Sequence, residues 1–316
     1  MQFWTDARDV PSDFGPSAVT VGKFDGLHAG HRAVIATLLS IAAERELVPA
    51  VVTFDRNPLS VIRPELCPDP LVSNSQKAEL LAQAGVEATL MVTFDEEFRT
   101  MSAEAFVSEI LVKALRARVV LVGGDFRFGS RGSGDVALLT RLGAELGFEV
   151  VVIDDVVPDG TRRVSSTWVR ELLAQGDVKG AAALLGTLPS VRATVVHGAH
   201  RGRELGYPTA NLATEREGFT PADGVYAAWL TVRGVRYPAA VSIGNNPTFE
   251  GVPEKQVEAH ALDQDFDIYG ETVTLEFVEH IRGMVKYTTV EALIDQIARD
   301  EEIAREILGI APRTPS

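Results

Sequence analysis

Two histidines and three glycines share one short stretch of the chain, GKFDGLHAGH. His28 and His31 are three residues apart, a spacing that places both side chains on one face of a helix. The stretch lies where a strand pattern leads into a helical pattern, and a helix N-terminus attracts phosphate groups. The stretch has no side chain at Gly22, Gly26 and Gly30, so a nucleotide could approach the backbone closely at these three positions. The stretch therefore predicts a site for a phosphate-bearing ligand.

Other interpretations of this histidine pair stay open. The H-x-x-H spacing also arises by chance, since His197 and His200 repeat it in the same chain. A zinc site has weaker support, because the spacing is not that of H-E-x-x-H and no third histidine or cysteine lies nearby in the sequence. The Walker A pattern G-x-x-x-x-G-K-[ST] does not occur in the chain, so a nucleotide would have to be bound by another device.

The elements around this stretch alternate between strand and helix patterns. Nearly continuous apolar runs predict strands at 17–22, 49–54, 88–94, 118–124 and 149–154. Apolar residues at helical spacing predict helices at 31–46, 74–85, 102–116 and 135–147. This alternation predicts an α/β domain, a Rossmann-like doubly wound parallel sheet covered by helices on both faces. Ligands of such sheets bind beyond the carboxyl ends of the strands, which is where the two histidines would lie.

The second half of the chain has a different pattern. Residues 165–186 predict two short helices. From residue 191 onward, β-branched runs alternate with clusters of Gly, Pro and Asn, which is typical of a small antiparallel β-barrel. A C-terminal helix is predicted over 290–309. We therefore expect two domains, residues 1–186 and 187–316.

The composition excludes several classes of protein. Of the 316 residues, 46% are hydrophobic, which is enough to form large cores. The formal net charge of −14 disfavours binding to nucleic acid or to an anionic membrane. The single cysteine, Cys67, rules out an internal disulfide and a cysteine-based zinc site, and it fits a reducing compartment. Without a signal-peptide pattern or a membrane-spanning apolar run, we expect a cytoplasmic protein; its oligomeric state, a homo-oligomer included, stays open.

Several motifs, in order along the chain, resemble those of one enzyme family. GKFDGLHAGH resembles the GxFDGxHxGH signature of nucleotidyltransferases that transfer an adenylyl group from ATP, and VSSTWVRELL resembles their I-S-S-T-x-x-R motif. GRELGYPTANL resembles the G-R-x-L-G-F-P-T-A-N motif of riboflavin kinases, and DGVYAAWL, SIGNNPTF and VEAHALDQDFDIYGETVTLEFVEHIR continue that resemblance. Together they resemble the bifunctional bacterial riboflavin kinase/FMN adenylyltransferases, or FAD synthetases. The resemblance implies phosphorylation of riboflavin to FMN and adenylylation of FMN to FAD, with ATP and Mg²⁺ and with release of pyrophosphate.

The resemblance also implies which residues act in the first domain. His28 and His31 match the pair that stabilises the phosphates in the transition state, and Arg170 matches an arginine that helps to hold the ATP phosphates. Further ATP-binding positions are implied at Gly22, Phe24, Asp25, Gly26, Gly30, Ser166 and Thr167. Flavin-binding positions are implied at Phe54 and Asp125. Without the resemblance, the serine and threonine fit a plain helix N-cap and Arg170 fits a solvated helix face.

A kinase site is implied in the second domain, with Glu258 as its catalytic glutamate. Thr209 and Asn211 match the pair that coordinates Mg²⁺ and the phosphates, and such oxygen ligands suit a hard cation that keeps several waters. A turn that would cover the nucleotide is implied at Gly198, Arg201 and Gly202. Without the resemblance, Glu258 fits an exposed charge on a strand and YPTANL fits a turn.

One departure from the family pattern follows the predicted strand 49–54. The family usually has T-F-x-P-H-P there, whereas this chain has TFDRNP, with Arg56 in place of proline and Asn57 in place of histidine. Asparagine donates and accepts hydrogen bonds but carries no charge. The sequence therefore leaves open a riboflavin kinase whose adenylyltransferase is weakened or inactive. A flavin-binding sensor without turnover is a second rival, although candidate catalytic residues occur in both domains.

Overall fold

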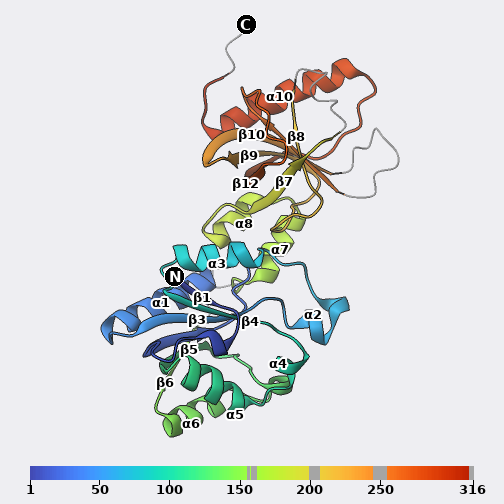
Figure 1. The fold of residues 1–316 in the computed structure, drawn as a ribbon. Coiled ribbons are helices and arrows are strands. Elements are labelled where there is room, and N and C mark those ends of the chain that lie inside the picture. Colours follow the sequence, from blue (N-terminus) through green and yellow to red (C-terminus); the bar gives the residue numbers. More distant parts are fainter. Residues whose placement is uncertain (155–156, 158–161, 199–206, 245–254, 313–316) are drawn as a thin grey trace. The chain divides into compact units, whose positions relative to one another are not determined.

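The computed structural model describes residues 1–154, 157, 162–198, 207–244 and 255–312 (Figure 1). The chain divides into two compact units, Met1–Ser165 and Ser166–Ser316. The predicted fold class is confirmed, because a parallel α/β sheet is followed by a closed antiparallel barrel and a C-terminal helix. The predicted functional boundary between residues 186 and 187 stays a prediction.

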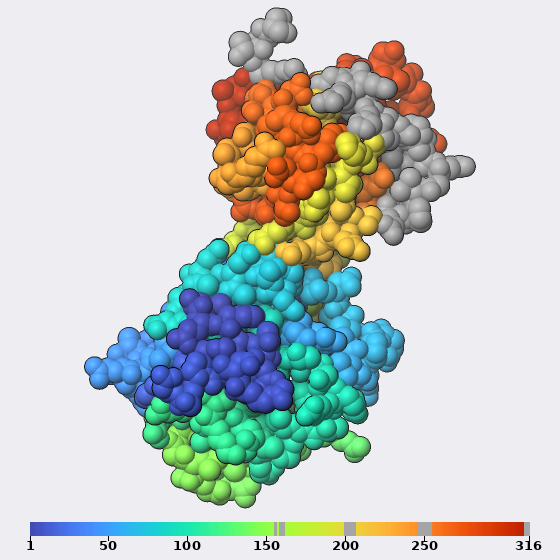
Figure 2. Space-filling view, in the orientation of Figure 1, coloured from blue at the N-terminus to red at the C-terminus, as the bar shows by residue number. Residues whose placement is uncertain are grey.

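The first unit is built on a six-stranded parallel sheet with the strand order β1-β4-β3-β2-β5-β6. Its strands are β1 (Gln2–Trp4), β2 (Ser17–Val21), β3 (Val48–Phe54), β4 (Ala88–Val92), β5 (Ala117–Gly123) and β6 (Glu149–Ile153). Only β1 was not predicted; it lies at the edge of the sheet, and the dark blue N-terminal residues are at the surface of this unit in Figure 2. The strand order changes direction between β2 and β5, and open α/β sheets bind ligands at such a switch point.

Helices cover both faces of this sheet, as predicted. The helical segments described in this unit are η1 (Ala7–Asp9), α1 (Ala29–Glu44), α2 (Leu59–Ile62), η2 (Pro64–Leu66), α3 (Asn74–Gln83), α4 (Glu96–Thr100), α5 (Ala103–Ala105), the π-helix η3 (Phe106–Ala114), η4 (Ser130–Gly132) and α6 (Val136–Leu146). α1 and α3 pack on the face that carries Ala18 and Val51, whereas η3 and α6 pack on the face that carries Val19 and Val52. Neighbouring strand residues thus enter opposite cores, which explains why the strands are apolar runs without alternation.

The second unit contains a closed six-stranded barrel with the order β10-β11-β8-β7-β12-β9, in which every neighbouring pair is antiparallel. Its strands are β7 (Ser190–Val196), β8 (Ala210–Leu212), β9 (Gly224–Val232), β10 (Val235–Gly244), β11 (Gln256–Ala261) and β12 (Thr272–Arg282). The interior is filled by fully buried apolar side chains, among them Leu230, Val241 and Phe277. Closure leaves the barrel without an open sheet edge.

Among the described residues of this unit, three helices pack on the barrel: α7 (Ser166–Ala174), α8 (Val178–Leu185) and α10 (Val290–Leu308). The Ala222 N–H donates to the Leu173 carbonyl at the end of α7 (2.9 Å), and Lys179 of α8 forms an ion pair with Glu279 of β12 (2.9 Å). Ala304 of α10 is fully buried in a cluster with barrel residues. In the part of the chain that the structure describes, no helix has both the length and the apolar character needed to cross a membrane.

Candidate active sites

The stretch GKFDGLHAGH forms the turn from β2 into α1, at the carboxyl edge of the sheet. Its backbone has positive φ angles at Phe24 (48°), Gly26 (84°) and Leu27 (45°), a conformation that residues other than glycine rarely adopt. The Phe24 and Leu27 side chains are buried in the core with α1 (2% and 1% exposed), so packing holds the strained turn in place. The turn makes His28 the N-cap of α1 and places His31 in the first helical turn.

The predicted histidine pair is brought together. The rings of His28 and His31 stack with their centroids 3.8 Å apart, and the His31 ring also contacts the ring of Phe24 (5.0 Å). The Nδ1 atom of each histidine is buried, and neither atom has a hydrogen-bond partner among the described residues. Buried polar atoms of this kind are costly in a folded protein and are typical of functional sites.

Both imidazoles are neutral near pH 7. Burial lowers the pKa of His28 to about 4, and the positive charge of Arg163 acts in the same direction. Burial also lowers the pKa of His31 well below 6.5, and the positive charges of Arg163 and Lys23 act in the same direction. A neutral imidazole donates one hydrogen bond and accepts another. The pair can therefore meet phosphate oxygens as hydrogen-bond donors within a positively charged environment.

These pKa values should make the first unit sensitive to acid. An unfolded histidine has a pKa near 6.5, so between pH 6.5 and about 4 the unfolded chain binds a proton at His28 that the folded chain does not. We expect the stability that depends on neutral histidines to be complete above pH 6.5 and to be lost as the pH falls toward 4. Calorimetric unfolding of the intact protein across this range measures the loss, which should be smaller in His28→Gln. Equal acid sensitivity in the two proteins would contradict this assignment.

Other residues of the GKFDGLHAGH stretch leave room for the rings or hold the turn in place. A Cβ on Gly30 would lie 3.2 Å from the His28 ring, and a Cβ on Gly22 would lie 3.0 Å from the Phe24 ring. Asp25 accepts the N–H of Leu71 (2.8 Å), which ties the turn to the segment before α3. ATP binding stays a prediction for Gly22, Phe24, Asp25, Gly26 and Gly30.

The loop after β5, on the other side of the switch point, is linked to the two histidines through Arg163. Asp125 follows β5, and its exposed carboxylate pairs with Arg163 (2.9 Å), which lowers the pKa of that carboxyl. The charge of Arg163 also acts on both histidines, and the Val164 carbonyl lies 3.7 Å from a Cβ built on Gly30. Asp125 is therefore linked to the pair through Arg163, a residue that was not predicted. The flavin-binding role of Asp125 stays a prediction.

The second nucleotidyltransferase motif begins α7. Ser166 is the first residue of this helix, and Thr167 and Arg170 lie in its first two turns. The helix belongs to the second compact unit, whereas Val164 just before it belongs to the first and lies beside the histidine turn. Contact of the three motif residues with ATP stays a prediction.

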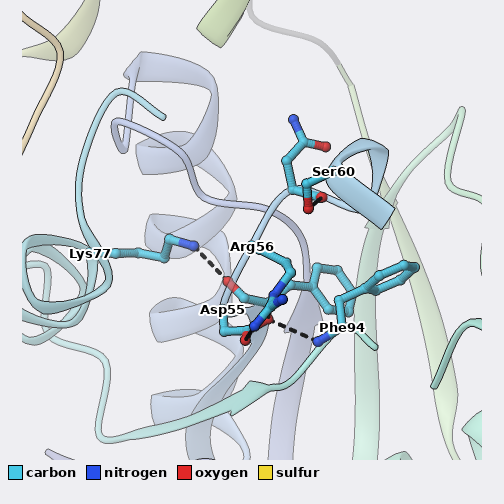
Figure 3. A network of polar contacts seen from close by, with 7 residues as sticks. Asp55, Arg56, Ser60, Lys77 and Phe94 are labelled. Atoms are coloured by element: carbon cyan, nitrogen blue, oxygen red, sulfur yellow. Dashed lines mark hydrogen bonds and ion pairs between the residues drawn. The ribbon is translucent and has the colours of Figure 1, made fainter. Parts of the chain in front are cut away.

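The segment that departs from the family pattern is fixed by polar contacts (Figure 3). Arg56 forms an ion pair with Asp55 (2.8 Å), and Asp55 accepts the N–H of Phe94 (2.9 Å). Lys77 of α3, which is only 7% exposed, donates to the Phe54 carbonyl (2.8 Å). Burial lowers the pKa of Lys77. The carboxyl end of β3 is thus held against α3 and β4.

Asn57, which takes the place of the usual histidine, shapes a local turn. Its side-chain oxygen accepts the N–H of Leu59 (3.2 Å), and its carbonyl accepts the hydroxyl of Ser60 (2.8 Å). This starts α2 and needs no charge. The sequence left open whether this substitution weakens adenylyl transfer, and these contacts give Asn57 a structural role only.

Phe54, predicted on the flavin side, belongs to a group of aromatic rings. Its ring packs edge-on against those of Phe94 and Phe98, with centroid distances of 5.6 and 5.9 Å. The ring is partly buried at the end of β3. Its contact with a flavin stays a prediction.

The predicted kinase residues converge in the barrel. β8 pairs with β11 so that Asn211 lies directly opposite Glu258, and directly opposed residues point to the same face of a sheet. Thr209 comes just before β8. Gly198 follows β7, and a Cβ on it would overlap the Asn211 amide, so only glycine leaves that amide its place. The remaining predicted turn residues, Arg201 and Gly202, lie outside the described residues.

Comparison with known proteins decides the family. The family model described as FAD synthetase matches residues 10–168, and the one described as riboflavin kinase matches residues 185–308. The bifunctional riboflavin kinase/FMN adenylyltransferase of Escherichia coli strain K12 is 38% identical, over 92% of this chain and 93% of its own length. That of Pseudomonas fluorescens is 36% identical, over 97% of this chain and 98% of its own. The chain belongs to this family.

As a bifunctional riboflavin kinase/FMN adenylyltransferase, the protein has both predicted activities. The comparisons support neither a kinase with an inactive adenylyltransferase nor a flavin-binding sensor without turnover. A solved structure from Streptococcus pneumoniae has the same fold, with a TM-score of 0.85 and 32% identity, and covers 96% of this chain and 98% of its own. It bears the name of a macrolide-efflux protein, which is a statement about that protein only. The predicted family, enzyme class and pair of reactions are thus confirmed.

A cavity opens in the riboflavin kinase unit beside the converging residues. Thr209 and Asn211 line it together with apolar and aromatic side chains, among them Leu230, Phe266 and Tyr269. An apolar cavity with a few convergent polar groups is typical of a small-molecule site. Two of the predicted kinase residues, Thr209 and Asn211, line this cavity and Glu258 does not; the kinase roles of all three stay predictions.

The donor set at this cavity fits Mg²⁺. Thr209 and Asn211 line the cavity with a hydroxyl and an amide, and Glu258, which is not a lining residue, offers a carboxylate directly opposite Asn211. Mg²⁺ is usually held by one or two protein groups together with substrate phosphates. The glycine at 198 leaves room for the Asn211 amide in this set. Within the described residues, no group of three His, Cys, Asp or Glu side chains could hold a metal ion by itself.

Proposed function

We propose that the two reactions use separate residue sets, with His28 and His31 acting in adenylyl transfer and Glu258 acting in riboflavin phosphorylation. The observation that carries the proposal is the pairing within each site. In the first unit the two histidines stack with buried, unpartnered Nδ1 atoms. In the second unit Asn211 lies opposite Glu258 beside a cavity.

In adenylyl transfer, the FMN phosphate attacks the α-phosphorus of ATP and pyrophosphate leaves. Negative charge on the phosphate oxygens is stabilised best by donors that are already in position. The imidazoles of His28 and His31 supply such donors, and Arg163 supplies positive charge nearby. The N–H groups at the start of α1 add to this, because a helix N-terminus favours phosphate. A role in holding the ATP phosphates is implied by the family resemblance for Ser166, Thr167 and Arg170.

In riboflavin phosphorylation, Glu258 accepts the proton of the primary hydroxyl as that oxygen attacks the γ-phosphorus of ATP and ADP leaves. Thr209 and Asn211 would hold Mg²⁺ and the phosphates, and the ion would neutralise charge on the phosphate oxygens. Gly198 leaves the Asn211 amide its place, whereas Arg201 and Gly202, which the family resemblance assigns to the nucleotide, lie outside the described residues. We assign the enzyme to the cytoplasm, where its single cysteine, Cys67, stays reduced.

The two activities should separate when the chain is divided. A fragment of residues 187–316 contains the whole barrel, and a fragment of residues 166–316 adds α7 and α8, which pack on it. We expect both fragments to form FMN from riboflavin, ATP and Mg²⁺ but no FAD, whereas the full chain forms both. The longer fragment should unfold at a higher temperature, because it keeps the contacts of Leu173 and Lys179 with the barrel. A fragment that binds riboflavin and ATP but forms no FMN would overturn the division.

A further inference from the structure

His260 lies two residues after Glu258 on β11, and the proposed mechanism does not use it. Residues two apart on a strand share a face, so both side chains belong to the same side of β11. His260 is only 9% exposed, and its ring joins two other segments. Nδ1 lies 2.7 Å from the carbonyl oxygen of Pro208, and Nε2 lies 2.7 Å from Oε1 of Glu301 on α10.

The hydrogen positions in this link follow from its chemistry. The Pro208 carbonyl can only accept, so Nδ1 of His260 must carry a hydrogen and donate it. On the other side, one proton is shared between Nε2 and the carboxyl group of Glu301, whichever of the two holds it. The ring cannot turn without breaking both contacts, so its orientation is fixed.

The far end of this link is a fixed point. Glu301 is 4% exposed, on the side of α10 that packs against the barrel. The helix is fastened there by Ala304 in an apolar cluster and by the ion pair between Asp300 and Arg282 of β12 (2.7 Å). Glu301 therefore holds the His260 ring from a rigid element.

The near end of the link lies beside a short strand. β8 has only three residues, and it pairs with β11 at Ala210 and Asn211 and with β7 at Asn211 and Leu212. Pro208 has no N–H to contribute to a strand ladder. The hydrogen bond from the His260 ring to the Pro208 carbonyl therefore stabilises the start of β8, as further backbone pairing would in a longer strand.

We propose that His260 and Glu301 are positioning residues of the kinase site. They hold the Pro208 carbonyl against β11 and thereby fix Thr209 and Asn211 where Asn211 faces Glu258. This inference rests on the proposed role of Thr209 and Asn211 in binding Mg²⁺ and phosphate. Residues that orient such ligands typically contribute about 10–100-fold to metal affinity or activity.

Two variants of His260 separate its two contacts. The amide nitrogen of asparagine falls near the place of Nδ1, so His260→Asn keeps a donor for Pro208 and loses the contact with Glu301. The amide of glutamine reaches the place of Nε2, so His260→Gln does the reverse. We expect faster hydrogen exchange over residues 207–212 in His260→Gln, and an increase of about tenfold in the Mg²⁺ concentration that gives half-maximal FMN formation. His260→Asn should stay closer to the wild type in both measurements.

A second pair of variants tests the other end of the link. Glu301→Gln can donate to Nε2 while Nδ1 keeps its hydrogen, so it should resemble the wild type. Glu301→Ala, like His260→Asn, keeps a donor for Pro208 and loses the contact with α10, so it should shift exchange and Mg²⁺ dependence in the direction of His260→Gln but by a smaller amount. This pair decides the question if His260→Gln does not fold. FAD formation from supplied FMN should be unchanged in every variant, and riboflavin fluorescence titration reports whether the barrel is intact.

The outcomes distinguish this inference from the proposed function beneath it. If Thr209→Ala raises the Mg²⁺ requirement but His260→Gln changes neither exchange nor Mg²⁺ requirement, the positioning role is wrong and the metal role stands. Equal effects of His260→Gln and His260→Asn on exchange would also overturn the positioning role, because the Pro208 contact would then not hold the segment. If Thr209→Ala leaves the Mg²⁺ requirement unchanged, the proposed role of Thr209 fails, and with it the inference that His260 orients a metal-binding segment.

Discussion

Replacing Glu258 by glutamine should stop FMN formation while riboflavin binding stays largely intact. Glutamine keeps the size and polarity of the side chain but cannot accept a proton at neutral pH, so the change tests chemistry separately from packing. A positioned general base typically contributes about 10²–10⁴-fold to the rate. The pairing of Glu258 with Asn211 across β11 and β8 is made by backbone groups, so the variant leaves this strand pairing in place. We expect kcat and kcat/KM to fall together, as they do when an interaction made only in the transition state is lost.

The measurement is riboflavin turnover by Glu258→Gln beside a titration of flavin fluorescence. Glu276→Gln is a matched control, because Glu276 is another barrel glutamate whose ion pair with Arg236 (2.9 Å) is a partly exposed surface pair. FMN supplied directly should still be converted to FAD. Turnover near the wild-type level in Glu258→Gln would remove this residue as the base and leave it as a charge on a barrel strand.

The parallel sheet could be predicted because its strands are buried on both faces. β2 is buried at every position from Ser17 to Val21, and such a strand appears in the sequence as a short run of small and β-branched residues without alternating charged positions. β1 gave no such signal, since it has three residues at the sheet edge and Phe3 is 42% exposed. Its pairing with β4 depends on a partner more than 80 residues away, which local sequence does not specify.

The kinase site shows the same limit of local sequence. YPTANL is compatible with a turn, because Pro208 and Asn211 favour turns, yet Asn211 lies within β8. Closure of the barrel imposes this strand by supplying β7 and β11 as neighbours. Family resemblance pointed to Asn211 and Glu258 separately, but only the strand register places them opposite each other.

Two residues that shape the candidate sites were not predicted. Arg163 stands directly before the VSST motif, and a cation at that place was a signal for a phosphate site. His260 is two residues from Glu258, a spacing that puts both on one face of a strand. Its partners, Pro208 and Glu301, come from distant parts of the chain, so only the fold shows what it contacts.

Replacing His28 or His31 by alanine should nearly abolish adenylyl transfer and leave riboflavin phosphorylation unchanged. Loss of one prepositioned donor to a transition state typically lowers the rate by about 10²–10³-fold. Because the two rings stack at 3.8 Å, removing one also removes the packing that orients the other. We therefore expect His28→Ala and His31→Ala to be similar, and the double variant to lose little more than either single variant.

The test follows FAD formation from supplied FMN and ATP, with riboflavin phosphorylation by the same sample as the internal measure of folded protein. His28→Gln is the matched variant, since its amide keeps a neutral donor near the place of Nε2; it should retain more adenylyl transfer than His28→Ala. This order follows from the neutral state of the buried imidazole, which acts through its N–H and not through a positive charge. Loss of FMN formation to the same extent as FAD formation would indicate a folding defect or a shared site. Full activity in both alanine variants would show that the stacked pair belongs to the core of the turn and takes no part in catalysis.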